Sequence, residues 1–241
     1  MIKVTGLEDA AVAIADAMAN QQHLSVQSMA TKSALGRDVS YDSYLDVSAF
    51  TGIKDYQPDE LILTVRAGTP MHEVEAALAC ANQMLAFEAP DLHKLLGTQS
   101  AGTIGGVLAT NASGPRRLTA GAARDYLLGF EAISGRGERF KSGGKVMKNV
   151  TGYDLSKLIC GSYGTLAVFD EVTFKTLPRP ETNISLLFGC EDMTLAVAKI
   201  ASVFASPHEP NAAAILPGSM AASAGIAVSY THLTLPTILL V

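Results

Sequence analysis

The 241-residue sequence contains no tryptophan, only 17% charged residues and only three cysteines. Cys80, Cys160 and Cys190 are widely separated and lack CxxC spacing. Such cysteines are typical of reduced thiols in the cytosol and argue against a disulfide framework and a zinc ribbon. They also cannot hold an iron–sulfur cluster within this chain. We therefore expect a cytoplasmic protein.

A basic surplus is also absent, because 18 Lys and Arg residues against 23 Asp and Glu residues give a net charge of −5. This balance argues against a partner that is a nucleic acid. No long apolar run is present, so we expect neither a signal peptide nor a transmembrane segment. No two histidines lie at metal-ligand spacing, and we expect no protein-bound metal. The hydrophobic share of 48% is sufficient for a folded core in one large domain or two small ones.

The hydrophobic periodicity predicts helices mixed with strands, as in an α/β or α+β fold. Helices are predicted at residues 7–20, 70–81 and 193–204, the second with Thr69 as its cap and Pro70 as its first residue. The apolar stripe of the last helix consists of Met193, Val197, Ile200 and Phe204. Strands are predicted at residues 23–27, 44–48, 60–68, 126–134, 138–141 and 184–189, and at 165–175 as a strand pair or one bent strand.

The segment GTIGGVLATNASGPRR, residues 102–117, contains four glycines and no charged or aromatic side chain before Arg116. Its spacing excludes the GxGxxG fingerprint, and no P-loop pattern precedes Lys145. Backbone N–H groups of such turns can still hold phosphate, and residues 102–106 are expected to lead into a short helix. The alternative is a structural loop with glycine turns. Three more clusters of small residues, at 113–117, 121–125 and 148–165, favour a shared ligand.

Four segments of the chain resemble the PCMH-type FAD-binding domain of the vanillyl-alcohol-oxidase family. They are VRAGTPMHEVEAALACANQMLAFEAPD, GTIGGVLATNASGPRR, GAARDYLLGFEAISGRGE and GGKVMKNVTGYDLSKLICGSYGTLAVFDEVTFKTLPRP. More narrowly, SGPRR and VMKNVTGYDLSKL resemble an FAD-binding subunit of bacterial glycolate oxidases. The resemblance covers about residues 20–180.

The resemblance implies an α+β fold with FAD between two subdomains, at about residues 1–92 and 93–180. Residues 181–227 are expected to be the truncated beginning of an α+β cap domain. The segment 228–241 shares no pattern with the preceding chain, and VSYTHL back-translates to a transposon end used in sequencing libraries. We interpret this segment as a non-native tail, with a native terminal strand as the alternative.

The resemblance also assigns cofactor-binding residues in the second subdomain. They are Gly102, Thr103, Ile104, Gly105 and Gly106 beside the flavin and pyrophosphate, Ser113 and Gly114 in the next turn, the pair Arg124 and Asp125, and Gly164, Thr165 and Val168 beside the adenosine half. Small residues permit this close backbone approach. We expect a valine at Gly105 to exclude FAD by its bulk and to leave the fold largely intact.

Three further residues, Lys148, Tyr153 and Asp154, are candidates for contact with flavin or substrate. For Asp154 the alternative is a helix cap. No catalytic residue is assigned.

The loop QSMATKSALG, residues 27–36, departs from the family pattern. Ser28, Met29 and Ala30 stand where the family usually has three glycines, and a positive φ costs such residues about 1–2 kcal/mol each. We therefore expect weakened pyrophosphate binding, which three glycines would restore. Lys32 matches the loop lysine of the family and suits a phosphate neighbour, with a solvated lysine as the alternative. The loop contains no histidine, so we expect FAD to be bound noncovalently.

The resemblance implies that glycolate, a small 2-hydroxy acid, is oxidised to glyoxylate by hydride transfer to FAD. The implied partners are a large flavin subunit and an iron–sulfur subunit, through which the chain would attach to the periphery of the inner membrane. One alternative is a stand-alone FAD-dependent 2-hydroxyacid dehydrogenase of the D-lactate type. Another is a flavin-poor structural subunit, which the altered loop favours.

Overall fold

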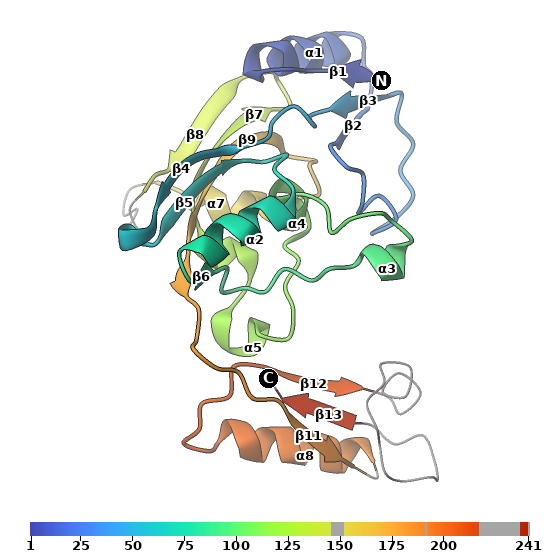
Figure 1. Ribbon diagram of the computed structural model, residues 1–241. Coiled ribbons are helices and arrows are strands. Elements are labelled where there is room, and N and C mark those ends of the chain that lie inside the picture. The colour runs from blue at the N-terminus through green and yellow to red at the C-terminus, as the bar shows by residue number, and fades with distance from the viewer. Residues whose placement is uncertain (146–151, 191, 217–236, 241) are drawn as a thin grey trace. The chain divides into compact units, whose positions relative to one another are not determined.

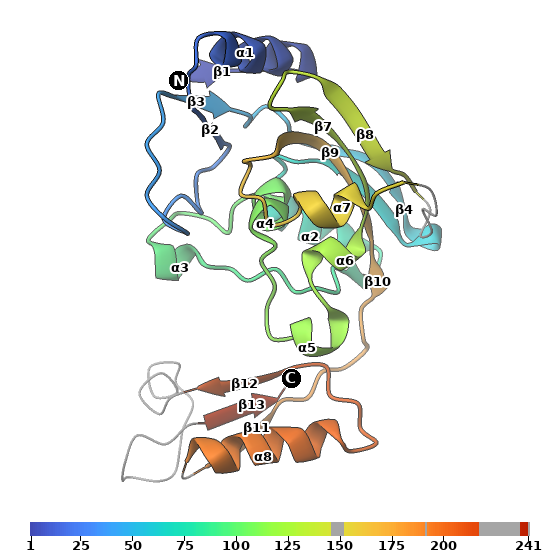
Figure 2. The same ribbon diagram turned by 180° about the vertical axis from the view of Figure 1, so that it is seen from behind.

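Two compact units make up the protein (Figures 1 and 2). The computed structural model describes residues 1–145, 152–190 and 192–216 and the backbone of residues 237–240. Unit 1 comprises Met1–Ser113 and Ala122–Arg179, and unit 2 comprises Gly114–Gly121 and Pro180–Val241. The chain therefore passes through unit 2 twice.

A five-stranded sheet forms the centre of unit 1, with the strand order β4-β5-β9-β7-β8 and antiparallel pairing throughout. Its strands are β4 (Ile53–Gln57), β5 (Ile62–Arg66), β7 (Leu127–Ser134), β8 (Arg139–Gly143) and β9 (Ala167–Lys175). The predicted strands in these regions are confirmed, and residues 167–175 form one strand. Strand β4 was not predicted, because its largely polar sequence at the sheet edge contains no apolar run.

The main core lies between this sheet and several helices, which Figure 2 shows beside β7 and β9. The helices are α2 (Met71–Cys80), α4 (Ile104–Thr110), α6 (Ala123–Tyr126) and α7 (Leu155–Ile159). Helix α2 contributes Met71, Val74 and Leu78, as its periodicity predicts, and α4 contributes Ile104 and Leu108. Helix α4 confirms the prediction that the glycine-rich segment leads into a short helix.

A smaller parallel sheet, with the order β1-β3-β2, packs beside helix α1 (Leu7–Ala19). Its strands are β1 (Ile2–Lys3), β2 (Leu24–Gln27) and β3 (Ser43–Asp46). The predicted helix and the two predicted strands are confirmed. A second core joins α1 and β3 to Ile133 and Val168 of the large sheet.

Short elements connect these parts of unit 1. They are η1 (Pro58–Glu60), β6 (Gln83–Met84), α3 (His93–Leu96) and β10 (Leu177–Pro178), and β6 pairs with β10.

Unit 2 contains α5 (Arg117–Ala120), helix α8 (Met193–Phe204) and the antiparallel sheet β11-β13-β12. Its strands are β11 (Leu186–Gly189), β12 (Ala213–Leu216) and β13 (Thr237–Leu240). The predicted domain borders and the interpretation of residues 228–241 as a tail stay predictions. Residues 228–236 and 241 lie outside the described residues.

Two predictions about helices need correction. Helix α2 begins at Met71 with Pro70 as its N-cap, and the Thr69 hydroxyl instead donates to the Arg66 carbonyl and accepts from the Gly52 N–H. In α8, Met193 and Val197 of the predicted apolar stripe are more than half exposed, whereas Ile200 packs against the small core of unit 2, so only part of the stripe is borne out. The buried residue on α8 is Ala196, which is too small to stand out in the periodicity.

Candidate functional site

The loop after β2 meets the segment that precedes α4, as Figure 1 shows. The Lys32 ammonium donates to the Ala101 carbonyl oxygen over 3.0 Å, and the Ser100 hydroxyl contacts the Met29 sulfur at 3.7 Å. A Cβ atom at Gly102 would clash with the Thr31 hydroxyl and lie 2.9 Å from Lys32 Nζ. Glycine is therefore required at residue 102, where φ is +88°. Two predicted site residues, Lys32 and Gly102, are thus neighbours.

Lys32 is partly buried, which makes its charge sensitive to what binds nearby. Burial lowers the pKa of Lys32, and the Asp91 carboxylate partly opposes this change. An anion placed beside the ammonium would favour its charged form. The environment of Lys32 therefore suits a phosphate group better than a neutral ligand.

The first turn of α4 uses its own N–H groups for internal hydrogen bonds. The Thr103 hydroxyl accepts from the Gly106 N–H over 3.2 Å and thereby caps the helix. The Ile104 N–H donates to the Thr69 carbonyl, and the Gly105 N–H donates to the Ala67 carbonyl over 2.7 Å. These groups hold α4 on the end of β5.

Gly105 has a structural reason to be glycine. A Cβ atom there would lie 2.6 Å from the Ala67 carbonyl oxygen and 2.9 Å from the Ala67 Cβ atom. The expectation that a valine at this position leaves the fold intact is therefore wrong, because the clash is with the backbone at the end of a central strand. At Gly106 the nearest atom to an added Cβ would be the Thr103 hydroxyl oxygen at 3.5 Å, an ordinary contact distance.

Residues 161–165 form a loop that contacts both the C-terminal end of α4 and strand β2. The Gly161 N–H donates to the Leu108 carbonyl, and the Tyr163 N–H donates to the Ala109 carbonyl. A Cβ atom at Gly164, where φ is +76°, would lie 3.7 Å from Val26 Cβ on β2. Both ends of α4 are therefore joined to segments that the sequence predicts to bind the cofactor.

The altered loop at residues 28–30 contains one strained residue. Ala30 has a φ of +51°, whereas Ser28 and Met29 have ordinary negative φ values. The expectation that all three residues have a strained backbone with positive φ is wrong for Ser28 and Met29. Only Ala30 takes the left-handed conformation that favours glycine.

Two hydroxyl groups in these loops are buried without a hydrogen-bond partner. They are Ser28 Oγ and Ser162 Oγ, and they are the two buried side-chain oxygen or nitrogen atoms that lack a partner across the described part of the chain. Native proteins nearly always satisfy buried polar groups, so each unsatisfied one is a candidate position for a bound ligand, ion or water. The sequence prediction did not include either hydroxyl, since burial of a serine leaves no sequence signal.

The remaining predicted site residues have local partners. The Arg124 N–H donates to Asn111 Oδ1, and the Asp125 carboxylate accepts from the Ala122 N–H at the beginning of α6. Val168 is only 5% exposed and packs in the second core. Thr165 donates its hydroxyl to the Ser162 carbonyl.

In the next turn, the Ser113 hydroxyl donates to the Asn111 carbonyl, and Gly114 belongs to unit 2. Of the further candidates, Lys148 lies outside the described residues and Tyr153 is 90% exposed. The Asp154 carboxylate caps α7 by accepting from the Lys157 N–H. The capping alternative for Asp154 is thus confirmed.

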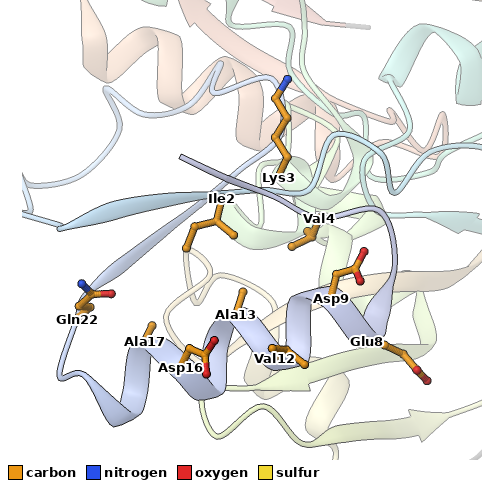
Figure 3. A pocket seen from close by; sticks show the side chains of 10 residues that line it. All are labelled: Ile2, Lys3, Val4, Glu8, Asp9, Val12, Ala13, Asp16, Ala17 and Gln22. Atoms are coloured by element: carbon orange, nitrogen blue, oxygen red, sulfur yellow. The ribbon is translucent and has the colours of Figure 1, made fainter.

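A shallow groove of about 440 Å³ lies elsewhere, between β1 and α1 (Figure 3). Val4, Ala13 and Ala17 line its apolar part, and Asp9 and Asp16 are among its acidic residues. None of the predicted cofactor-binding residues lines this groove.

None of the helices in the described ranges combines the length and the apolar character that a membrane crossing requires. Within the same ranges, His, Cys, Asp and Glu side chains form no group of three or more that could hold a metal ion.

The comparisons with known proteins agree on the kind of fold. A family model described as "FAD binding domain" matches residues 1–143. The solved structure of an alkyldihydroxyacetonephosphate synthase superposes with a TM-score of 0.78 at 16% identity, covering 99% of this chain and 46% of that one. The protein is therefore an α+β flavoprotein with a PCMH-type fold.

The chain belongs to the FAD binding domain family, and FAD is its cofactor. The partly buried Lys32 and the two unpartnered hydroxyls fit a polar, anionic cofactor of this type. In such a site Lys32 would lie near a phosphate group of FAD, whose isoalloxazine ring supplies the redox chemistry.

Several curated relatives are similar to parts of the chain. Glycolate oxidase subunit GlcE of Escherichia coli K12 is 45% identical over 170 residues, which is 70% of this chain and 47% of that protein. Glycolate oxidase subunit GlcD of Bacillus subtilis 168 is 39% identical over 108 residues, which is 45% of this chain and 23% of that protein. A D-lactate dehydrogenase of Anaerostipes hadrus is 37% identical over 110 residues, 46% of this chain and 23% of that protein. The chain thus spans about half the length of GlcE and about a quarter of the length of the other two relatives.

Proposed function

We propose that this chain is the FAD-binding subunit of a glycolate-oxidase-like complex that oxidises a small 2-hydroxy acid. The observation that carries the proposal is the 45% identity over 170 residues to a glycolate oxidase subunit. Other relatives are named D-lactate dehydrogenase and D-2-hydroxyglutarate dehydrogenase, and both names refer to a 2-hydroxy acid as substrate. A 2-hydroxy acid is thus the substrate class that these relatives favour together.

The reaction removes a hydride from carbon 2 of the acid and a proton from its hydroxyl group, which yields a 2-oxo acid. Bound FAD would supply the group that accepts the hydride with its two electrons. The residues of this chain bind and orient the cofactor, with Lys32 near the phosphates, and with the segment 102–106 at the beginning of α4 and the loop 161–165 around it. The proposed partners, a large flavin subunit and an iron–sulfur subunit, carry the electrons onward.

The test is a pull-down of the tagged chain with the two proposed partner subunits after co-expression, followed by assays of dye reduction. We expect a stable complex that reduces the dye faster with glycolate than with D-lactate. The control is the complex without this chain, which we expect to be inactive with glycolate. A complex that forms without this chain and keeps full glycolate activity would overturn the proposal.

The similarity to D-lactate dehydrogenases favours a second candidate, a stand-alone dehydrogenase. That candidate predicts dye reduction with D-lactate by the purified, FAD-loaded chain in the absence of any partner. The complex-dependent proposal predicts no such activity, so one assay separates the two.

A further inference from the structure

We propose that the groove between β1 and α1 binds an extended segment of another polypeptide, which adds to the free edge of β1 and carries two basic side chains. The groove has a volume of about 440 Å³ and lies within unit 1 (Figure 3). The inference concerns a surface for a partner chain, so it does not depend on the oxidation of any substrate.

Strand β1 forms an edge of the small parallel sheet and has unused backbone groups. In the described part of the chain, β1 pairs with β3 alone. The Val4 N–H donates to the Asp46 carbonyl of β3 over 3.2 Å. Since successive residues of a strand direct their N–H and C=O groups to opposite sides, those of Lys3 point away from β3. They can therefore pair with an added strand, which is one of the ways in which proteins bind extended peptides.

The side chains of an added strand would have room above α1. Ile2 points toward α1 and Lys3 points away from it, as Figure 3 shows. Alternate side chains of a strand beside β1 would therefore face the helix as well. Ala13 and Ala17 present only methyl groups to the groove, and Val12 is 61% exposed. An apolar side chain above them would bury surface that this chain alone leaves open.

Two carboxylates flank the apolar part of the groove and select the charge of the segment. Asp9 lies four residues before Ala13 on α1, and the exposed Asp16 lies three residues after it. Hydrogen bonds from the Thr5 hydroxyl and N–H lower the pKa of Asp9, so its carboxylate is ionised at neutral pH.

The spacing of these residues matches that of a strand. A helix rises about 1.5 Å per residue, and side chains on one face of a strand repeat about every 6.6 Å. Three successive side chains on the groove-facing side of the segment would thus meet Asp9, Ala13 and Asp16. A segment in which these three are basic, apolar and basic complements the groove.

A second copy of this chain is a poor occupant of the groove. Two β1 strands paired about a two-fold axis would place Lys3 opposite the second copy's Lys3, and like charges directly opposite each other are destabilising. The carboxylates of Asp9 and Asp16 from both copies would also meet at that interface. The occupant is therefore a different chain with a basic segment.

The experiment titrates the isotope-labelled, FAD-loaded chain with three synthetic heptapeptides and follows the backbone amide signals by NMR. The peptide TKTVTKT projects both lysines and the valine to one face of a strand. The peptide KTTVTTK has the same composition but projects its lysines to the face opposite the valine, and TETVTET reverses the charge. We expect TKTVTKT to shift the amide signals of Lys3 and of residues 12–17, with a Kd about fivefold or more below that of either control peptide.

Two substitutions test the charge and the strand edge separately. Asp16→Lys should raise the Kd for TKTVTKT by about three- to tenfold. Asp59→Lys makes the same charge change in η1, outside the groove, and should alter the Kd by about twofold or less. Lys3→Pro removes the outward N–H without removing a hydrogen bond to β3, so it should raise the Kd by about tenfold although the protein becomes more negative.

Four results would overturn the inference. TKTVTKT may leave the signals of Lys3 and of residues 12–17 unshifted, or it and KTTVTTK may bind equally well, which would reflect charge alone. Asp16→Lys and Asp59→Lys may have equal effects. A dimer of the chain in sizing chromatography that Asp16→Lys dissociates would show that a second copy occupies the groove. If Lys3→Pro does not fold, the comparison of Asp16→Lys with Asp59→Lys decides, because both side chains are exposed.

Discussion

Two adjacent glycines in α4 meet opposite surroundings, although nothing in the sequence distinguishes them. Gly105→Ala places a Cβ atom against the Ala67 backbone, so we expect the free energy of unfolding to fall by about 1–3 kcal/mol. Gly106→Ala meets only ordinary contacts, and its better helix propensity should leave stability unchanged or raise it by up to about 1 kcal/mol. Urea denaturation of the FAD-free protein measures both. Equal losses in the two variants would contradict the packing argument.

The strain at Ala30 gives a second matched pair in the altered loop. Ala30→Gly relieves a left-handed conformation that costs about 1–2 kcal/mol, against an entropy cost of about 0.4–1 kcal/mol in the unfolded chain. We expect a net gain of about 0–1.6 kcal/mol in the free energy of unfolding. Met29→Gly, where φ is negative, should lose about 0.5–1 kcal/mol because only the entropy cost remains. Thermal denaturation measures both variants, and a gain in each would show that the loop changes its path.

The cysteines should differ in their reaction with thiol reagents. Burial raises the pKa of Cys160 to about 12, whereas Cys80 is exposed. Because the thiolate is the reactive form, we expect a disulfide reagent at pH 8 to label Cys80 rapidly and Cys160 only on unfolding. Mass spectrometry of digested samples after timed labelling measures both sites. Labelling of Cys160 as fast as that of Cys80 would mean that the core around α7 opens readily.

At the scale of elements, the β7–β8 hairpin contains a buried carboxylate with two cationic partners. Glu131 accepts from Arg139 over 3.1 Å and pairs with Lys141 over 2.8 Å. Burial raises the pKa of Glu131, but the bonds to Lys141 and Arg139 outweigh burial, so the net pKa is lowered. Above the pKa that Glu131 has in the unfolded chain, about 4.3, the ionised carboxylate contributes its full stabilisation to the fold. This stabilisation is lost as the pH falls through the lower pKa that Glu131 has in the folded protein.

Glu131→Gln should accordingly lower the free energy of unfolding by about 1 kcal/mol at pH 7 and by less near pH 3. Melting temperatures recorded from pH 3 to pH 7 test this difference. The control is Glu8→Gln, which removes an exposed partner of Arg139 and should change stability little. A constant loss at every pH would show that Glu131 acts through packing and not through its charge.

The elements that could be predicted are those whose side chains carry a clear period. The apolar residues of β5 and the stripe of α2 are buried where the sequence places them. Strand β4 was not predicted because its polar residues lie at a sheet edge. The buried face of α8 was not predicted because the residue buried there is the small Ala196 and not Met193. The loops of the site were found by resemblance. Their two buried hydroxyls depend on which distant segments pack together, and this information is not local.

At the scale of the whole molecule, the chain enters unit 2 at Gly114–Gly121 and again from Pro180. The Thr119 hydroxyl donates to the Asn211 carbonyl, so the first excursion contacts the second within that unit. The connecting residues 181–185 are exposed and without regular structure.

A Glu-specific protease should therefore cut after Glu181 before it cuts after Glu171 in β9. The fragments 1–181 and 182–241 should co-elute from a sizing column in buffer and separate in urea, because residues of both build unit 2. Sizing chromatography with mass spectrometry of the fractions measures this. Fragments that already separate in buffer would show that Gly114–Gly121 contributes little to that unit.

The pairing of β5 with β9 joins two strands that the ribosome synthesises at different times. Arg66 on β5 forms its ion pair with Asp170 on β9, 104 residues later in the chain. A ribosome adds about 5–20 residues per second, so β5 waits on the order of 5–20 s for its neighbour. Loop 161–165, which belongs to the proposed flavin site, emerges only just before β9, so the nascent chain cannot complete that proposed site earlier. During this interval the exposed edge of β5 can pair with other chains, which makes slow translation between residues 66 and 170 a hazard for the yield of folded flavoprotein.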